Sequence, residues 1–437
     1  MVAPTTALII CLGVLGVLLI LGTPIFMSLL LAGLVGTYVF EGGQMLSNVA
    51  GKIAFNQVTG YSLLAMPMFI LMGNLLMSHK MGDDLYEGIY KWFGWMPGGL
   101  AIASTVVCAI FCFMSGSNTA AAATVGSVAL PAMEKMKYDR PLALGTLAVA
   151  GTLAALIPPS TIMIIYGTAV SDVSIGKVFI GGIVPGLILT ALMSIYIYIY
   201  AVIYPQKAPR GESSTFKEKM AALPRLLPVI VLFITIIGGM YAGIFTAIEA
   251  SAASVFVTLL IVIVNRRFKW TRVLDALLRT VKTAGMIYMI IIGATVMGHL
   301  FFITGFREVV SNYILQFNMP GWGTMIVILL ILTIMGTFLD VVALIMISVP
   351  IFLPIAVHMG YTGVWFGVIM TIASEMALCT PPVGVNLFVI QGIAPPGTTL
   401  LTVAKGAFPF IFVIWVLLLI LIFYPGLVTW LPNTMMG

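Results

Sequence analysis

Long apolar segments of membrane-spanning length dominate the hydrophobic pattern of this chain. They occur at 4–22, 24–40, 61–79, 178–203, 226–242, 244–264, 283–303 and 406–430. A helix needs about 20 apolar residues to cross the hydrocarbon core, whereas a barrel strand needs only about 10. Because lipid offers no hydrogen-bond partners, the backbone must satisfy itself within each segment. The pattern therefore predicts an all-α polytopic membrane protein.

The same pattern occurs twice along the chain. Met96-Pro97-Gly98 recurs as Met319-Pro320-Gly321, and Pro158-Pro159 recurs as Pro381-Pro382, in both cases 223 positions later. The offset holds without gaps from about residue 23 to 159. A hydrophobic chain that is built from two such halves, each interrupted at matching positions, is typical of inverted-repeat secondary transporters.

Two apolar stretches in corresponding positions are broken near their middle, and we expect each to form a re-entrant hairpin. The first covers 99–131 with a break at 115–118, and the second covers 322–355 with a break near Gly336-Thr337. Half-helices of about 15 residues rise only ~22 Å, which reaches the middle of a ~30 Å core without crossing it. Broken helices with a Pro-Pro pair follow the hairpins, at 141–170 and 362–393.

More polar stretches complete the predicted organisation. Mixed segments at 43–60 and 266–282 suit interfacial arm helices. The stretch 204–226 is the most polar linker, and we place it on the cytoplasmic side. It separates a first inverted repeat at 1–203 from a second at 227–437.

Charge fixes the expected orientation. Only 8% of the residues are charged, compared with about 25% in soluble domains. Basic residues gather at 80–91, 135–140, 207–225 and 266–282. If all four clusters are cytoplasmic, both termini are periplasmic and the two repeats are inverted. A nucleic-acid partner is excluded, because the positive charges are scattered between segments that belong in a lipid bilayer.

The four breaks carry the candidate chemistry. Proline frees a backbone carbonyl, and an exposed carbonyl is unfavourable in hydrocarbon unless something fills the site. With hydroxyl and amide oxygens, such carbonyls form a hard-oxygen cage suited to Na⁺, while half-helix N-termini favour an anion. A single break is usually only a kink, and the small residues 119–123 could serve helix packing instead. Four breaks that are paired by one offset favour ion sites.

Acidic residues in apolar segments are further candidates. Asp340 lies at the second hairpin tip, where its counterpart in the first repeat is Ser117. We interpret it as a cation ligand or gate, the alternative being a carboxylate that backbone donors satisfy. Glu375 precedes Thr380 by five residues and is placed to support the second cage, whereas Glu249 is expected at a helix interface.

Three stretches together resemble one family. They are 113–122 (FMSGSNTAAA), 156–160 (LIPPS) and 243–250 (GIFTAIEA). They are similar to signatures of the large membrane subunit of tripartite ATP-independent periplasmic (TRAP) transporters, although Ala247 stands where the family commonly has proline. The resemblance implies an elevator transporter of the ion-transporter superfamily type in the bacterial inner membrane. It also implies Na⁺ symport, a small four-helix membrane subunit and a periplasmic binding protein. The substrate would be an organic acid, either sialic acid or a similar acidic sugar, or a C4-dicarboxylate.

The resemblance also implies a set of site residues. One Na⁺ would be held by Ser115, Asn118, Ile157 and Pro158. A second Na⁺ would be held by Gly336, Thr337, Thr380 and Val383. The substrate path or its gate would involve Ser117, Ser160, Asp340 and Asn386.

Two other function classes are weighed against this interpretation. A stand-alone Na⁺/divalent-anion symporter, as a homodimer, would share the Pro-Pro breaks. An intramembrane hydrolase using Ser115 or Ser160 lacks a base that the sequence places nearby. Neither a Walker loop nor an H-E-x-x-H motif occurs, so we expect a transporter rather than an enzyme.

Overall fold

Helices account for the regular structure throughout the part of the chain that is described. The computed structural model describes residues 3–79, 81–170 and 172–436, with side chains except at 44–50, 82, 83, 112, 114, 115 and 436. Seven of the described helices are long and apolar enough to cross a membrane. The predicted all-α polytopic fold is confirmed.

The first repeat contains two long antiparallel helices, an arm, a hairpin and a broken helix. Its elements are α1 (Pro4–Ile20), α2 (Ile25–Glu41), α3 (Gly43–Thr59), the 3₁₀ turn η1 (Tyr61–Leu64), α4 (Ala65–Ser78), α5 (Met81–Phe93), α6 (Gly99–Ser115), α7 (Asn118–Lys135), α8 (Arg140–Ala150), the 3₁₀ turn η2 (Gly151–Ala155), α9 (Thr161–Ala169) and α10 (Ile175–Ile203).

The second repeat has the same order after a short linker. The linker contains α11 (Phe216–Ala222) and the turn η3 (Leu223–Leu226). The elements of the second repeat are α12 (Leu227–Phe233), the π-helical turn η4 (Ile234–Gly238), α13 (Gly239–Tyr241), α14 (Ala247–Val264), α15 (Trp270–Ile303), α16 (Phe306–Leu315), α17 (Gly321–Gly336), α18 (Val341–His358), α19 (Gly363–Ala377), α20 (Val385–Ile393), α21 (Leu400–Phe423) and α22 (Gly426–Met436).

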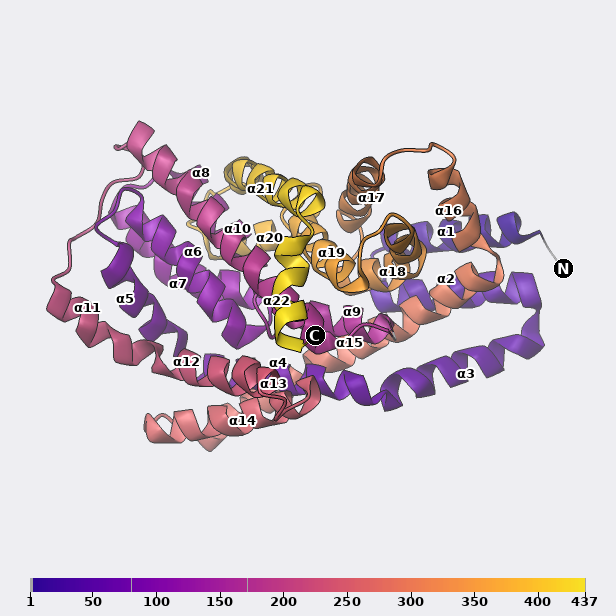
Figure 1. The fold of residues 1–437 in the computed structure, drawn as a ribbon, viewed down its shortest axis with the longest axis horizontal. Coiled ribbons are helices and arrows are strands. Elements are labelled where there is room, and N and C mark those ends of the chain that lie inside the picture. The colour runs from indigo at the N-terminus through magenta and orange to yellow at the C-terminus, as the bar shows by residue number, and fades with distance from the viewer. Residues whose placement is uncertain (1–2, 80, 171, 437) are drawn as a thin grey trace.

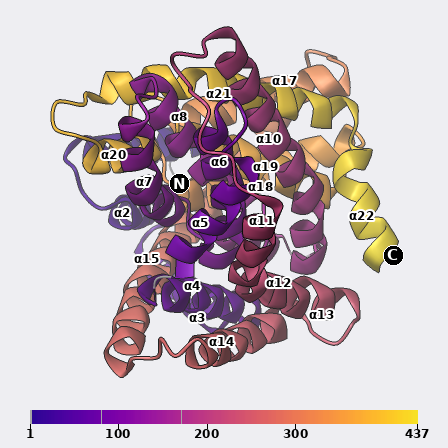
Figure 2. The same ribbon diagram turned by 90° about the vertical axis from the view of Figure 1, so that its left-hand side faces the viewer.

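The two repeats interlock rather than standing side by side. Helices α3 and α14 run along one side of the molecule, and α8, α17 and α21 lie on the opposite side in both views (Figures 1 and 2). Helix α15 packs along α2 and α4, and α14 packs on α4. We call α1–α4 and α12–α15 the scaffold. Helices α6–α9 and α17–α20 form the rest of the interior.

Glycines allow the closest helix crossings. A Cβ added to Gly33 of α2 would lie 2.8 Å from the backbone nitrogen of Met297 in α15. One added to Gly406 of α21 would lie 1.8 Å from the carbonyl oxygen of Pro141 in α8. No side chain fits at either position, so direct backbone packing holds these helix pairs together.

The second arm departs from the prediction of a separate interfacial helix at 266–282. It begins at Trp270 and continues into the following span as one helix of 34 residues. In the first repeat, the corresponding arm ends at Thr59, and Gly60 and η1 separate it from α4. The reason is local, because the offset aligns Gly60 with Thr283, and threonine continues a helix more readily than glycine does.

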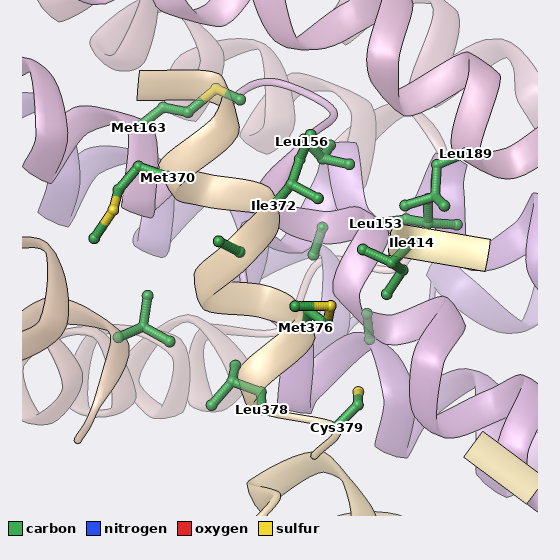
Figure 3. Close-up of a cluster of buried hydrophobic side chains, with 14 of the residues drawn as sticks. Leu153, Leu156, Met163, Leu189, Met370, Ile372, Met376, Leu378, Cys379 and Ile414 are labelled. Carbon is green, nitrogen blue, oxygen red and sulfur yellow. The ribbon is translucent and has the colours of Figure 1, made fainter. Parts of the chain in front are cut away.

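Helix α19 lies at the centre of the fold. Every residue from Trp365 to Ala377 is buried. Figure 3 shows Met370 and Met376 of this helix in a cluster with Leu153 from the first repeat, and with Leu189 and Ile414 of α10 and α21. The helix that leads into the second Pro-Pro break is therefore enclosed by elements of both repeats.

Candidate functional site

The first hairpin turns over two residues, Gly116 and Ser117. Helix α6 ends at Ser115 and α7 begins at Asn118. Gly116 has a φ of +57°, in the left-handed region that glycine adopts without a steric penalty. Ser117 caps α7, with its hydroxyl oxygen 3.5 Å from the backbone nitrogen of Ala120. The side chain of Ser115, a predicted Na⁺ ligand, lies outside the described side chains.

The first hairpin tip contacts the first Pro-Pro break. Thr161 donates a hydrogen bond of 3.2 Å from its hydroxyl to the carbonyl oxygen of Gly116. Ser160 is fully buried and caps α9 by accepting from the backbone nitrogen of Met163 at 3.3 Å. The carbonyl oxygens of Ile157 and Pro158 accept no hydrogen bond from any residue that the structure describes. The break therefore leaves two hard oxygen acceptors just before Pro159, whose own carbonyl oxygen would lie 3.5 Å from a Cβ added to Gly116.

The second hairpin tip meets the second broken helix in the same way. A Cβ added to Gly336 would lie 2.5 Å from the Cβ of Ala377, so the tip touches the end of α19. Thr337 donates its hydroxyl to the carbonyl oxygen of Ile334 at 2.8 Å. Within the described chain, no hydrogen bond reaches the carbonyl oxygens of Gly336 and Thr337. In the second repeat these carbonyls belong to the hairpin, whereas in the first repeat Ile157 and Pro158 belong to the broken helix.

The second Pro-Pro break lies between α19 and α20, with Thr380 before the prolines and Gly384 after them. Thr380 donates its hydroxyl to the carbonyl oxygen of Met376 at 2.8 Å. Gly384 has a φ of +53° and starts α20 from the left-handed region. Val383 stands directly before it, exposed by 43%. The Pro158-Pro159 and Pro381-Pro382 peptide bonds are both cis.

Asp340 caps a helix at the second tip. One of its carboxylate oxygens, Oδ1, accepts from the backbone nitrogen of Val342 at 2.9 Å at the start of α18. A backbone donor thus satisfies one carboxylate oxygen of Asp340. A carboxylate satisfied by backbone donors was the alternative to a role as cation ligand or gate. Its predicted role as cation ligand or gate stays a prediction, as do the other site assignments.

A hydrogen bond that the sequence analysis missed joins the two repeats. The side-chain amide of Asn118, on the first hairpin, donates from Nδ2 to Oε1 of Glu375 on α19. Helix α7 packs on α20, and α18 packs on α9, so each hairpin also contacts the broken helix of the other repeat. The sequence shows only that Asn118 needs a distant partner, because a buried amide must be hydrogen-bonded and no polar residue lies nearby in sequence.

Two other polar residues that the sequence singled out have hydrogen-bond partners in the structure. Asn386 is fully buried, and its amide nitrogen donates to the carbonyl oxygen of Ala148 in α8 at 3.3 Å. It faces α8, and its position on the substrate path remains a prediction. Glu249 caps α14 instead of facing a helix interface, because it accepts from the backbone nitrogen of Thr246 at 2.8 Å.

Comparison with known sequences places this arrangement in a family. Residues 12–427 match the family described as "Tripartite ATP-independent periplasmic transporter, DctM component". The chain is 34% identical to the C4-dicarboxylate TRAP transporter large permease protein DctM of Pseudomonas aeruginosa, over 85% of this chain and 86% of that protein. It is 32% identical to the isethionate TRAP transporter permease protein DctMQ of Oleidesulfovibrio alaskensis, over 95% and 65%. It is 31% identical to the ectoine TRAP transporter large permease protein TeaC of Halomonas elongata, over 95% and 96%.

The fold is also similar to a solved structure. The YdaH transporter of Alcanivorax borkumensis superimposes with a TM-score of 0.60 over 89% of each chain, at 11% sequence identity, which is a likeness of fold alone. A tripartite transporter of the matched family combines a large permease with a small membrane subunit and a periplasmic binding protein. The chain therefore belongs to the DctM component family of tripartite ATP-independent periplasmic transporters, as a large permease and not an enzyme.

Proposed function

We propose that this permease imports an organic acid together with Na⁺, after a periplasmic binding protein delivers the acid. The observation that carries the proposal is that each hairpin tip contacts a broken helix of its own repeat at a point where carbonyl oxygens are left free. Cage 1 comprises Ser115, Asn118, Ile157 and Pro158. Cage 2 comprises Gly336, Thr337, Thr380 and Val383.

The donor set of both cages suits Na⁺. Hydroxyl, amide and backbone carbonyl oxygens are hard ligands, and none of these residues is a thiolate or imidazole that would favour a transition metal. Free carbonyls inside an apolar protein are unfavourable unless a cation or donor satisfies them. A Na⁺ ion in each cage would satisfy the carbonyl pair of Ile157 and Pro158 and that of Gly336 and Thr337.

Helix N-termini supply the anion side of the proposal. The N-termini of α7, α9 and α18 are capped by Ser117, Ser160 and Asp340. The carboxylate of Asp340 already places negative charge at α18. We therefore place the substrate carboxylate beside the hydroxyls of Ser117 and Ser160, where the helix dipoles attract an anion. Sialic acid or a similar acidic sugar, or a C4-dicarboxylate, is the substrate class that we propose.

The elevator motion that we propose is supported by how the helices pack. The hairpins and broken helices contact one another across the repeats, so they form one body. The scaffold forms the other. A cavity of about 720 Å³ lies between them, lined by residues such as Thr168 and Ser174 on one side and Gly243 and Glu249 on the other. With the basic clusters in the cytoplasm, both termini and this cavity lie on the periplasmic side.

Reconstitution tests the proposal directly. Proteoliposomes that contain the permease and its small subunit are supplied with the binding protein and with radiolabelled sialic acid or succinate. We expect uptake only with an inward Na⁺ gradient and with the binding protein. Equal uptake in K⁺ alone would refute the Na⁺ coupling. Uptake of free substrate by the permease alone would favour a stand-alone symporter.

A further inference from the structure

A single buried hydrogen bond connects the two halves of the candidate site. Asn118 starts α7 in the first repeat, and Glu375 lies near the end of α19 in the second. The side chain of Glu375 is 2% exposed and that of Asn118 is 9% exposed. The two residues are 257 positions apart in the chain, so only the folded interior brings them together.

Glu375 determines which way the amide of Asn118 faces. An asparagine presents an NH₂ donor on one side and a carbonyl acceptor on the other, whereas a carboxylate oxygen accepts. Because Nδ2 donates to Oε1 of Glu375, Oδ1 of Asn118 is turned away from α19. The amide oxygen, rather than the NH₂ group that would repel a cation, is therefore available to cage 1.

Glu375 is also close to cage 2. Two residues later, Ala377 touches Gly336 at the second hairpin tip, and the neighbouring Met376 accepts the hydroxyl of Thr380. One glutamate side chain thus lies between the two proposed cation sites.

The carboxylate has an oxygen left over. Oε2 of Glu375 is buried and accepts no hydrogen bond from any described residue. The ion pairs among the described side chains involve Arg225, Arg267 and Arg279, none of which pairs with Glu375. A buried carboxyl group without a cationic partner takes up a proton unless a cation lies beside it, so the charged form of Glu375 requires a nearby positive ion.

We propose that Glu375 is a positioning residue that couples the two cation cages. It holds Asn118 with Oδ1 toward cage 1, and a cation bound in cage 2 would favour its charged form, which is the stronger acceptor for the amide. A Na⁺ ion in cage 1 would fix Asn118 and, through Glu375, the end of α19 against the tip of hairpin 2. Because cage 2 is built on that tip, the two sites bind Na⁺ cooperatively. This inference rests on the proposed function, because it requires Na⁺ at both sites.

Three single variants separate the hydrogen bond from mere packing. Glu375→Leu keeps the volume and removes the acceptor, so we expect the half-saturating Na⁺ concentration to rise by about tenfold and the Hill coefficient to fall toward 1. Glu375→Gln can still accept the same hydrogen bond, so its shift is smaller, about threefold. Ser374→Ala is the matched control, because Ser374 is equally buried and bonds only its own helix, at the carbonyl of Met370. Its Na⁺ dependence stays that of wild type.

Exchanging the donor and the acceptor between positions 118 and 375 gives a test that does not depend on loss of folding in a single variant. Asn118→Asp alone sets two carboxylates against each other, and we expect uptake to be lost. In the double variant Asn118→Asp/Glu375→Gln, the amide introduced at 375 donates to the carboxylate introduced at 118. This restores the bond in the opposite direction and returns Na⁺-dependent uptake.

The outcomes distinguish a failure of the coupling through Glu375 from a failure of the proposed Na⁺-coupled uptake. Uptake by the wild type that does not depend on Na⁺ defeats the proposed function. A wild type that depends on Na⁺, together with an unchanged Hill coefficient in Glu375→Leu, defeats the coupling alone. A double variant that transports no better than Asn118→Asp also defeats the coupling, provided that both variants purify with the small subunit.

Discussion

The two hairpins share one sequence pattern but sit differently against the scaffold. Hairpin 1, formed by α6 and α7, packs directly on α4, α5 and α12, with the rings of Phe113 and Phe233 5.5 Å apart. Hairpin 2, formed by α17 and α18, packs on α15 and α16 through α18, and a cavity of about 570 Å³ lies between this hairpin, α1 and α16. That cavity is lined only by apolar groups.

The difference teaches that equivalent repeats need not be in equivalent states. In an inverted-repeat transporter, exchanging the conformations of the two halves generates the opposite-facing state. The structure shows hairpin 1 packed on α4 and α12, whereas hairpin 2 packs on α15 and α16 and has an apolar cavity beside it. We infer that the second state closes hairpin 2 onto α1 and α16 and loosens hairpin 1. The predictions below test this asymmetry, beginning with the largest expected effect.

The tips differ most at Asp340 and its counterpart Ser117. We expect Asp340→Ala to lower uptake by more than about tenfold, because it removes a membrane-depth charge and a helix cap together. Ser117→Ala removes only a neutral cap and should lower uptake far less. Asp340→Asn separates the two contributions, because asparagine caps equally well without the charge. Initial uptake rates in proteoliposomes measure all three, and wild-type rates in Asp340→Ala would contradict the assignment.

The cavity beside hairpin 2 offers a matched pair of substitutions. Val327 lines it, and the repeat offset aligns Val327 with Ser104, which is fully buried in hairpin 1. Val327→Phe has room for its ring, so we expect unchanged thermal stability but several-fold slower uptake, because the filled cavity opposes closure of hairpin 2. Ser104→Phe has no such room and should lose about 1–3 kcal/mol through over-packing.

Thermal unfolding in detergent and uptake rates separate these two outcomes. If Val327→Phe transports at the wild-type rate, the cavity does not need to close during transport. If Ser104→Phe is as stable as the wild type, hairpin 1 is not packed as tightly as its contacts indicate.

The glycines of the two tips are required for different reasons. Gly116 needs its positive φ, whereas Gly336 needs the space that a Cβ would take from Ala377. Either change to alanine should cost about 1–2 kcal/mol of stability. Gly336→Ala/Ala377→Gly should recover the loss, because the clashing methyl group is removed. No truncation of a neighbour should rescue Gly116→Ala, because its strain lies in its own backbone. Equal rescue of both would refute this distinction.

The sequence could predict where the helices break, because the cause is local. Gly116, Pro158 and Pro381 each disfavour a continuing helix, and the structure interrupts the helices at all three places. The bond from Asn118 to Glu375 could not be predicted, because no local rule selects one buried carboxylate among several. Its existence depends on how α7 and α19 cross in the folded interior.

The smallest expected effect concerns the two arms. Helix α15 runs through Thr283 without interruption, whereas the first arm stops beside Gly60. Thr283→Gly should weaken the continuous helix by about 0.5 kcal/mol, and Thr283→Ala should strengthen it by a similar amount. Spin labels at Arg272 and Thr295, on the arm and the span of α15, would report a broader distance distribution only in the glycine variant. Identical distributions in both variants would show that packing against α2 and α4, rather than local helix propensity, keeps the second arm joined to its span.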